Sequence, residues 1–421
     1  MAVNPFIDRD DILAKIRAAF TARDAQYPAR RAELKKRLAP LAANLEHLQA
    51  SGHPMNCVDQ IRLEVQWLLN YRDEWDRAAR RIDDLEKSLT DPGQPAATQG
   101  EDGSWGGCCT EWYRKLEPTV DALQGDLPSA GLKKLLFMQP LSVPAYVLDY
   151  LYRLQISDIA NTGINNRDEL GAVQSALSQL IFKDQLRDLL ADNDLGFSVT
   201  PELEATYVDY LAQTQHPRTG YWGPWYRFDD RLVPVQDLSM TFHVIQYRSG
   251  NIANWPTVID STLLIKNLVY PAGWQPDAQT RYSNHNNYDV LSIFHYGWPH
   301  MSSEQKKSTR TEIAGMLAWC LTSGLPDPAA AAAGPSMLDT YYFAVRFLDR
   351  AGLWDTAKRF WLHKKPDLPT GSPAPHDLAL RLQAGFAKLR DNSEEADTVR
   401  ELLRIAACVS APIGHSVEAS D

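Results

Sequence analysis

The sequence feature that most restricts the fold is a weak recurrence in the C-terminal half. Asp237, Asp289 and Asp339 each open an aromatic-rich segment, and these openings are 52 and 50 residues apart. A fourth opening, at Asp377, follows after 38 residues. Recurrence at about 20–50 residues is typical of stacked supersecondary units that cannot bury their apolar faces alone. We therefore expect the chain to be built from repeated units.

Segments with the apolar spacing of helices lie between these openings, at 257–269, 302–321, 354–362 and 394–407. The pattern predicts one helix pair after another. The Asp-led helices are aromatic-rich, whereas their partners carry more charged residues, a contrast that favours an inner and an outer ring. We expect an all-α protein whose main domain, 96–421, is an α/α toroid, a ring of helical hairpins.

The N-terminal region, 1–95, is expected to form a helical hairpin region in front of the toroid. Asp8 and Asp10 stand where a helix cap belongs, and a longer helical pattern runs from Asp59 to Leu89. A stretch rich in Pro and Gly, 91–97, then breaks the pattern and marks the boundary. These N-terminal helices are a candidate surface for a homo-oligomer.

Charge and composition exclude several classes of protein. The chain has 53 acidic and 43 basic residues, which argues against nucleic acid as a partner because phosphate binding needs a basic face. It has no transmembrane run of about 18 apolar residues and no secretory signal pattern. Its five scattered cysteines argue against a disulfide framework and against zinc. We expect a cytoplasmic protein without a metal or other cofactor.

Two short stretches resemble the glutamine–tryptophan motif of terpene cyclases and their protein prenyltransferase relatives. Gln99 to Trp105 reads Q-x3-G-x-W, and Gln215 to Trp222 reads Q-x4-G-x-W. The resemblance implies an α/α toroid over roughly residues 100–360, in which the motif ties neighbouring helices together. The catalytic signatures of these families are mostly missing, because the DxDD sequence stands at 8–11 and the stretch from Asp339 lacks the histidine of a prenyltransferase zinc site.

In a toroid the inner helices point the same way, so their N-termini meet at one mouth. Each carries a partial positive charge of about 0.5 e and attracts anions. Asp237 and Asp289 are candidate acids there, with helix capping as the alternative role. His243 and Tyr247 are i,i+4 neighbours that suit proton transfer. The candidate catalytic residues are Asp237, His243, Tyr247, Arg248, His285, Asn287, Tyr288, Asp289 and His295.

The stretch 281–289, Arg-Tyr-Ser-Asn-His-Asn-Asn-Tyr-Asp, resembles polysaccharide lyases with α/α toroids. In these enzymes an Asn or Arg neutralises a uronate carboxylate, which acidifies the neighbouring C–H, and a His or Tyr removes the proton. The resemblance implies Asn286 or Asn287 for the first role and His285 or Tyr288 for the second. A loop that caps a helix is the alternative.

Aromatic residues gather between Gly220 and Tyr226. Their flat faces can stabilise a carbocation, stack on a sugar, or simply fill the interior of a ring. The candidate substrate-binding residues are Trp222, Trp225, Tyr226, Asn284, Trp298, Asp339 and Tyr341.

Three functions stay open. The first is a terpene-cyclase-like lyase or isomerase that acts by acid–base chemistry on an apolar or isoprenoid-type substrate in a central aromatic cavity. The second is a carbohydrate-active lyase or hydrolase on the same ring, with an oligosaccharide as ligand. The third is a non-catalytic binding module. The sequence lacks GxSxG, P-loop, GxGxxG and HExxH motifs, which disfavours serine hydrolases, nucleotide-dependent enzymes and zinc proteases.

Overall fold

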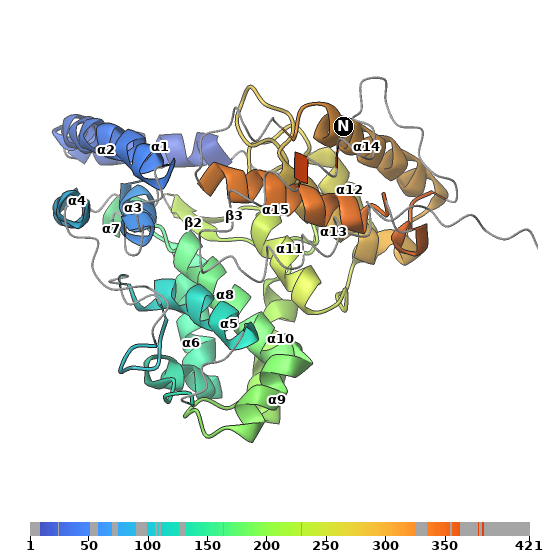
Figure 1. Ribbon diagram of the computed structural model, residues 1–421, viewed down its shortest axis with the longest axis horizontal. Coiled ribbons are helices and arrows are strands. Elements are labelled where there is room, and N and C mark those ends of the chain that lie inside the picture. The colour runs from blue at the N-terminus through green and yellow to red at the C-terminus, as the bar shows by residue number, and fades with distance from the viewer. Residues whose placement is uncertain are drawn as a thin grey trace, which may run out of the picture.

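The class of the fold is all-α, as predicted. The computed structural model describes residues 9–23, 25–50, 58–69, 75–89, 99–105, 108, 111–125, 131–162, 164–228, 230–325, 335–353, 356–362, 378 and 381–382. These residues are mostly helical (Figure 1). In this part of the chain no helix is long and apolar enough to cross a membrane.

The first four helices lie together at one side of the molecule (Figure 1). They are α1 (Arg9–Arg23), α2 (Tyr27–Ala50), α3 (Val58–Trp67) and α4 (Trp75–Ser88). The single pattern expected over 59–89 is thus two helices, which pack on each other. A buried ion pair between Arg81 Nη2 and Glu64 Oε2, 2.8 Å long, joins them.

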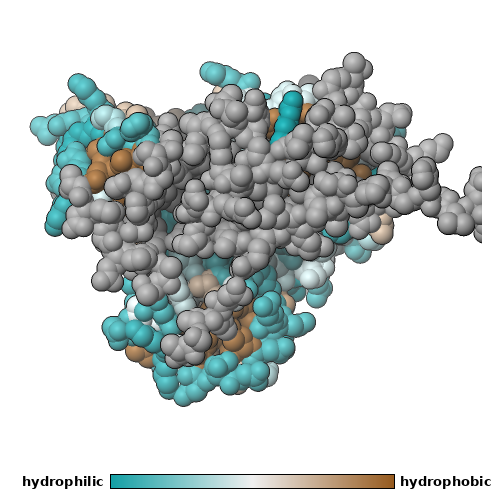
Figure 2. Space-filling model, in the orientation of Figure 1, coloured by the Kyte–Doolittle hydropathy of each residue, from teal (hydrophilic) through white to brown (hydrophobic). Residues whose placement is uncertain are grey.

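The outward side of these N-terminal helices is mostly hydrophilic, with a small hydrophobic area between them (Figure 2). The buried residues of α2, α3 and α4 belong to the same hydrophobic cluster as those of later helices, up to Met240 and Val244. Leu13 and Ile16 of α1 belong to a separate small cluster. The division at residue 95 and the homo-oligomer both stay predictions.

The remaining elements follow in two groups. The first group holds η2 (Trp112–Lys115), α5 (Leu116–Gln124), η3 (Leu136–Ser142), α6 (Pro144–Gln155), α7 (Ile159–Thr162), α8 (Arg167–Phe182), α9 (Asp184–Asp192) and α10 (Pro201–Thr214). The second group holds α11 (Leu238–Tyr247), α12 (Trp255–Leu264), α13 (Asn284–Gly297), η4 (Trp298–His300), α14 (Ser303–Thr322), α15 (Pro335–Arg350) and η5 (Thr356–Lys358).

Five of these helices form a continuous row of contacts, and we call them the central helices. α5 packs on α8, α8 on α11, α11 on α13, and α13 on α15. Helices α8 and α13 have buried residues on nearly every side, as expected for helices in the interior of a protein. Helices α6, α10, α12 and α14 pack against members of this row or against each other. The predicted alternation of Asp-led helices and partners is therefore seen in α11 to α15.

The starting points of the Asp-led helices differ from the prediction. Asp237 does cap α11, and its side chain accepts a hydrogen bond from the backbone N–H of Met240. Asp289, by contrast, lies inside α13, because Ser283 caps that helix by accepting from the N–H of Asn286. Asp339 also lies inside its helix, α15.

Two other predicted segments are shorter or not described. The helix expected over 354–362 is a 3-10 turn, η5, within that range. The opening at Asp377 and the helix expected over 394–407 lie outside the described residues.

A small sheet, which we did not expect, joins distant parts of the chain. It contains β1 (Ile156–Ser157), β2 (Trp225–Phe228) and β3 (Arg231–Pro234). β1 pairs with β2 in parallel from Ile156 opposite Trp225, and β2 pairs with β3 as a tight antiparallel hairpin. Tyr226 packs from this sheet against Leu13 and Ile16 of α1. The strands are too short to show an alternating pattern in the sequence.

The two Gln–Gly–Trp loops have the same construction. The side-chain amide N of Gln99 donates to the carbonyl of Gly103 and to that of Lys133, at 2.9 and 3.0 Å. The amide N of Gln215 donates in the same way to Gly220 and to Ala253, at 2.9 and 3.1 Å. Each glutamine thus ties its own turn to a later loop.

The tryptophans of the two loops also make matching contacts. The backbone N–H of Trp105 donates to Oγ1 of Thr119 in α5, and that of Trp222 donates to Oγ1 of Thr241 in α11. Each threonine is the fourth residue of its helix. The loops therefore hold the first turns of two central helices in the same manner.

Cysteine chemistry differs in part from the prediction. Cys320 is a free, buried thiol as expected. Cys108, however, is disulfide-bonded, although the scattered cysteines argued against a disulfide framework. Disulfides persist mainly in oxidising compartments, so the cytoplasmic location stays a prediction that this bond argues against.

Gly223 is expected to be irreplaceable, because an added Cβ would lie 2.0 Å from the carbonyl O of Val235. Gly223→Ala forces apart the segment just before β2 and the segment just after β3. We therefore expect the free energy of unfolding to fall by about 2 kcal/mol or more. Urea denaturation measures the change.

Gly171→Ala is the matched control. Its Cβ would meet Met240 at an ordinary 3.4 Å, and alanine is the better helix former by about 0.5–1 kcal/mol. Equal midpoints for the two variants would contradict the packing described here.

Candidate functional site

The N-terminal ends of three central helices are held together by ion pairs. Arg167, at the start of α8, bonds Asp237 through Nε to Oδ2 at 2.8 Å and through Nη2 to Oδ1 at 3.0 Å. Asp237 is only 1% exposed and also caps α11. Three donors occupy the carboxylate of Asp237. Its role is therefore to hold the two helix ends in position.

A second ion pair stands beside the first. Arg114, in η2 directly before α5, pairs with Asp168, the residue after Arg167. The starts of α5, α8 and α11 thus meet around two guanidinium groups and two carboxylates. The sequence prediction included only Asp237 of these four residues.

Glu117 lies in the first turn of α5, next to this group. Its side chain is accessible to water, yet burial among protein atoms raises its pKa, as does Asp168, while Arg114 and His285 oppose the rise. A raised pKa makes Glu117 a suitable general acid.

Asp289 organises two further side chains. It is fully buried, it accepts a hydrogen bond of 3.1 Å from the hydroxyl of Tyr270, and its Oδ2 lies 3.8 Å from Nε2 of His285. The His285 ring stacks on Phe343 of α15, with 4.2 Å between ring centroids. Burial and the charge of Asp289 raise the pKa of Tyr270, so this phenol stays protonated.

His243 faces the same place from α11. Its ring stacks on that of Tyr247, at 5.6 Å and 14°, which confirms the contact predicted from their spacing. Burial lowers the pKa of His243 to about 4, and the charges of His285 and Arg167 act in the same direction. At neutral pH His243 is therefore an uncharged imidazole with a lone pair that can accept a proton.

We call Glu117, His243, Tyr270, His285 and Asp289 the acid–base cluster. Electrostatic interactions link His243 to His285 and His285 to Glu117. The cluster draws on α5, α11, α13 and the loop before α13. It can supply a base, an acid and oriented donors in one place, which is what proton-transfer chemistry requires.

The asparagines of α13 do not join the acid–base cluster. Asn284 donates from Nδ2 to the carbonyls of Gly324 and Thr340 and so ties α13 to neighbouring segments. Asn287 is buried and its Nδ2 has no hydrogen-bond partner. It comes two positions after His285, so it points about 200° away around the helix.

Other predicted catalytic residues lie further along the central helices. Tyr288 packs against Phe343 and Phe242. Arg248 caps the C-terminal end of α11, and its guanidinium lies over the ring of Phe182. Asp237 caps the other end of the same helix. His295 packs against Phe360, and burial lowers its pKa to about 4.

Most predicted substrate-binding aromatics are structural. Trp222 is buried and donates from its indole N–H to the carbonyl of Leu211. Trp298 packs edge-to-face with Phe360, under the side chains of Lys306 and Arg310. Tyr226 is buried in the small cluster beside α1, and Tyr341 is buried inside the second half of the chain. The side chain of Asp339 lies outside the described residues.

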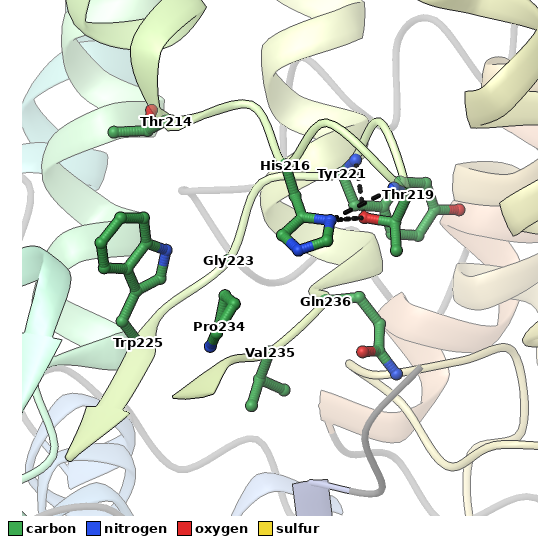
Figure 3. A pocket seen from close by; sticks show the side chains of 9 residues that line it. All are labelled: Thr214, His216, Thr219, Tyr221, Gly223, Trp225, Pro234, Val235 and Gln236. Carbon is green, nitrogen blue, oxygen red and sulfur yellow. Dashed lines mark hydrogen bonds between the residues drawn. The ribbon is translucent and has the colours of Figure 1, made fainter. Parts of the chain in front are cut away.

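Trp225 lines a separate small pocket (Figure 3). His216 and Thr219, from the second Gln–Gly–Trp loop, also line it, and Nδ1 of His216 accepts a 3.2 Å hydrogen bond from the N–H of Thr219. Burial and Arg218 lower the pKa of His216. The imidazole thus stabilises the turn, and the pocket belongs to the scaffold.

Sequence reasoning missed Glu117, Arg114, Arg167 and Tyr270. One pattern could have revealed the first. Each Gln–Gly–Trp loop is followed within about one helical segment by an acidic residue at the start of a central helix, Glu117 after Trp105 and Asp237 after Trp222. The arginines and the tyrosine carry no local pattern, because their partners are distant in sequence.

No protein-family model, curated protein or solved structure matches this chain. Its function is therefore inferred from the residues of the site alone. Among the described residues, no group of three or more His, Cys, Asp or Glu side chains is placed to hold a metal ion.

The lowered pKa values of His243 and His295, two half-buried side chains, predict a loss of stability in mild acid. His243 and His295 have pKa values of about 4 in the folded chain, below the usual 6.5. As the pH falls from about 6.5 to 4, the unfolded chain binds these protons first, so the free energy of unfolding decreases over this window. An NMR titration of the imidazole C–H signals should find both rings neutral at pH 5. Titration of either ring near 6.5 would show that it is not buried as described.

The opposite behaviour is expected for Glu117. Its folded pKa lies above the usual 4.5, so its contribution to stability is complete below that pH and is lost as the pH rises through the folded pKa. Glu117→Gln should therefore become more stable than the native protein as the pH rises above about 4.5. Thermal unfolding at several pH values measures this.

Glu101→Gln is the control for that experiment, because the Glu101 side chain is 96% exposed. It should show little change with pH. A Glu117→Gln variant that loses stability relative to the native protein with rising pH would mean that Glu117 forms a favourable ion pair instead.

Proposed function

We propose that the chain is an α/α toroid enzyme that cleaves an acidic sugar chain by acid–base elimination. The observation that carries the proposal is the acid–base cluster, in which a neutral imidazole and a carboxyl group of raised pKa both interact with His285. The reaction class follows from those groups, since elimination next to a carboxylate needs a base for the C–H proton and an acid for the leaving oxygen.

A closed ring is the arrangement that best explains the central helices. They follow one another in contact from α5 to α15. Asp121 of α5 in turn raises the pKa of Tyr342 of α15, so the two ends of the row are near each other.

The chemistry of the cluster favours a sugar over an isoprenoid. The tryptophans expected to wall a cavity, Trp222, Trp225 and Trp298, lie in scaffold contacts. The groups that gather instead are titratable, with His243 and His285 beside Tyr247 and Phe343, and such groups serve proton transfer directly. The isoprenoid enzyme remains the second candidate, because the two Gln–Gly–Trp loops resemble those of terpene cyclases. The disulfide at Cys108 fits an oxidising compartment, where polymeric sugars are found.

The reaction assigns a role to each group of the acid–base cluster. His285, oriented by Asp289 and Phe343, donates to the uronate carboxylate and so stabilises the negative charge that develops there. His243 accepts the proton from the carbon next to the carboxylate. The electron pair of that C–H bond forms the new C=C bond, the bond from the next carbon to the glycosidic oxygen breaks, and Glu117 protonates the leaving oxygen.

Activity assays test the proposal directly. The native protein is incubated with polygalacturonate, alginate and hyaluronate, and the ultraviolet absorbance of the new C=C bond is followed. We expect cleavage of at least one polymer, with His243→Ala and Glu117→Gln each slower by about 100-fold or more, the usual contribution of a general base or acid.

His300→Ala provides the matched control, because His300 is exposed and stacks only on Trp255 among described rings. It should keep the native rate. Absence of cleavage of any of the three polymers, or full activity of His243→Ala, would reject the elimination reaction.

A further inference from the structure

Three basic side chains gather one helical turn beyond the acid–base cluster. Lys183 follows the C-terminus of α8, and Arg346 and Arg350 lie in the last turns of α15. We call them the basic cluster. Tyr247 connects the two clusters, since it stacks on His243 and lies under the Lys183 ammonium, which is 5.0 Å from its ring centroid.

Lys183 is held by neutral oxygens. Its Nζ donates to Oε1 of Gln124 at 2.6 Å and to Oε1 of Gln179 at 2.8 Å. The two glutamines come from α5 and α8, so they fix the ammonium between two central helices. The carboxylate that acts on Lys183 is Asp121, whose effect on its pKa is smaller than that of burial.

The two arginines share one aromatic ring. The guanidinium groups of Arg346 and Arg350 lie 5.7 and 5.1 Å from the ring centroid of Tyr288. Arg350 also donates from Nη1 to Oε1 of Gln246 at 2.9 Å. Like Lys183, Arg350 is positioned by a side-chain amide and a π face, which fix its direction without neutralising it.

The basic cluster holds like charges close together. Burial lowers the pKa of Lys183; the carboxylate of Asp121 opposes this decrease, and the charge of Arg346 adds to it by a smaller amount. All three side chains are only half-buried, and the whole protein carries a net charge of -10. A local concentration of cations in an acidic protein attracts and orients an anionic ligand.

The spacing of residues along α5 and α11 relates the basic cluster to the acid–base cluster. Along α5, Glu117 and Asp121 are one turn apart, and so are His243 and Tyr247 along α11. One turn is about 5.4 Å, comparable with the length of one sugar unit in a chain. The basic cluster therefore stands about one unit away from the reacting sugar.

We propose that the basic cluster is an anion-binding subsite that takes a second acidic group of the substrate, on the sugar unit next to the one that reacts. The inference rests on the proposed function for the source of the anion, whereas the anion-binding chemistry rests on the three cations, which outnumber the neighbouring carboxylate of Asp121. The enzyme would thus select chains with acidic groups on consecutive units.

Equilibrium binding tests the subsite. Trigalacturonate is titrated by calorimetry into the full chain carrying His243→Ala, which prevents cleavage, and sodium sulfate is tested separately as a simple anion by its shift of the thermal midpoint. Each titration is repeated with Lys183→Gln and Arg346→Gln combined, and with Arg350→Lys, which keeps the charge. Lys134→Gln is the matched control, because Lys134 is an exposed lysine paired with Asp194.

We expect the combined variant to raise the Kd of trigalacturonate at least tenfold, to flatten its salt dependence and to abolish the sulfate shift. Arg350→Lys should retain most of the affinity, and Lys134→Gln all of it. Circular dichroism confirms that each variant is folded, and any variant that fails is replaced by its single-residue counterpart.

Two results separate the inference from the proposed function. If sulfate binding depends on the basic cluster but trigalacturonate, alginate trimers and hyaluronate oligomers do not bind, the anion subsite stands and the acidic-sugar function fails. If sulfate and the oligosaccharides bind equally well to the native side chains and to the combined variant, the subsite itself is overturned.

Discussion

The site depends on the buried ion pair between Arg167 and Asp237. Two parallel hydrogen bonds fix the start of α8 against the start of α11, and the same carboxylate caps α11. Asp168 extends the arrangement to Arg114 and hence to α5. Loss of one partner would leave the other charge buried without compensation, which typically costs about 3–5 kcal/mol. Everything that Glu117, His243 and His285 can do together requires these helix ends to meet.

Burial has opposite effects on the two kinds of titratable group at that meeting point. It keeps the His243 imidazole neutral, whereas it favours the protonated form of the Glu117 carboxyl. Burial thus acts on both groups in the direction that favours their uncharged forms. The polarity then changes along the helices, since the acid–base cluster near their N-terminal ends gives way to cations beside Tyr247 and Tyr288. A ligand that is anionic along its length would match this order of charges.

Local patterns predicted the helical class, the cap at Asp237 and the contact of His243 with Tyr247, because each depends on neighbours within one turn. They did not predict the role of Asp289, since a serine hydroxyl six residues earlier decides where α13 begins. Arg167 and Tyr270 were missed because their partners are brought to them only by the packing of helices. The tryptophans were overvalued as ligand contacts, since an indole N–H can equally satisfy a backbone carbonyl, as Trp222 does.

The two Gln–Gly–Trp loops are fastened in the same way. In both, the tryptophan N–H donates to the threonine in the fourth position of the helix that follows. Because each loop makes these hydrogen bonds with its own neighbouring segments, the bonds do not depend on which helices lie between the two loops. The chain could therefore have grown by duplication of a whole segment. Helical hairpins could likewise be inserted or deleted between the two loops without disturbing the hydrogen bonds of either loop.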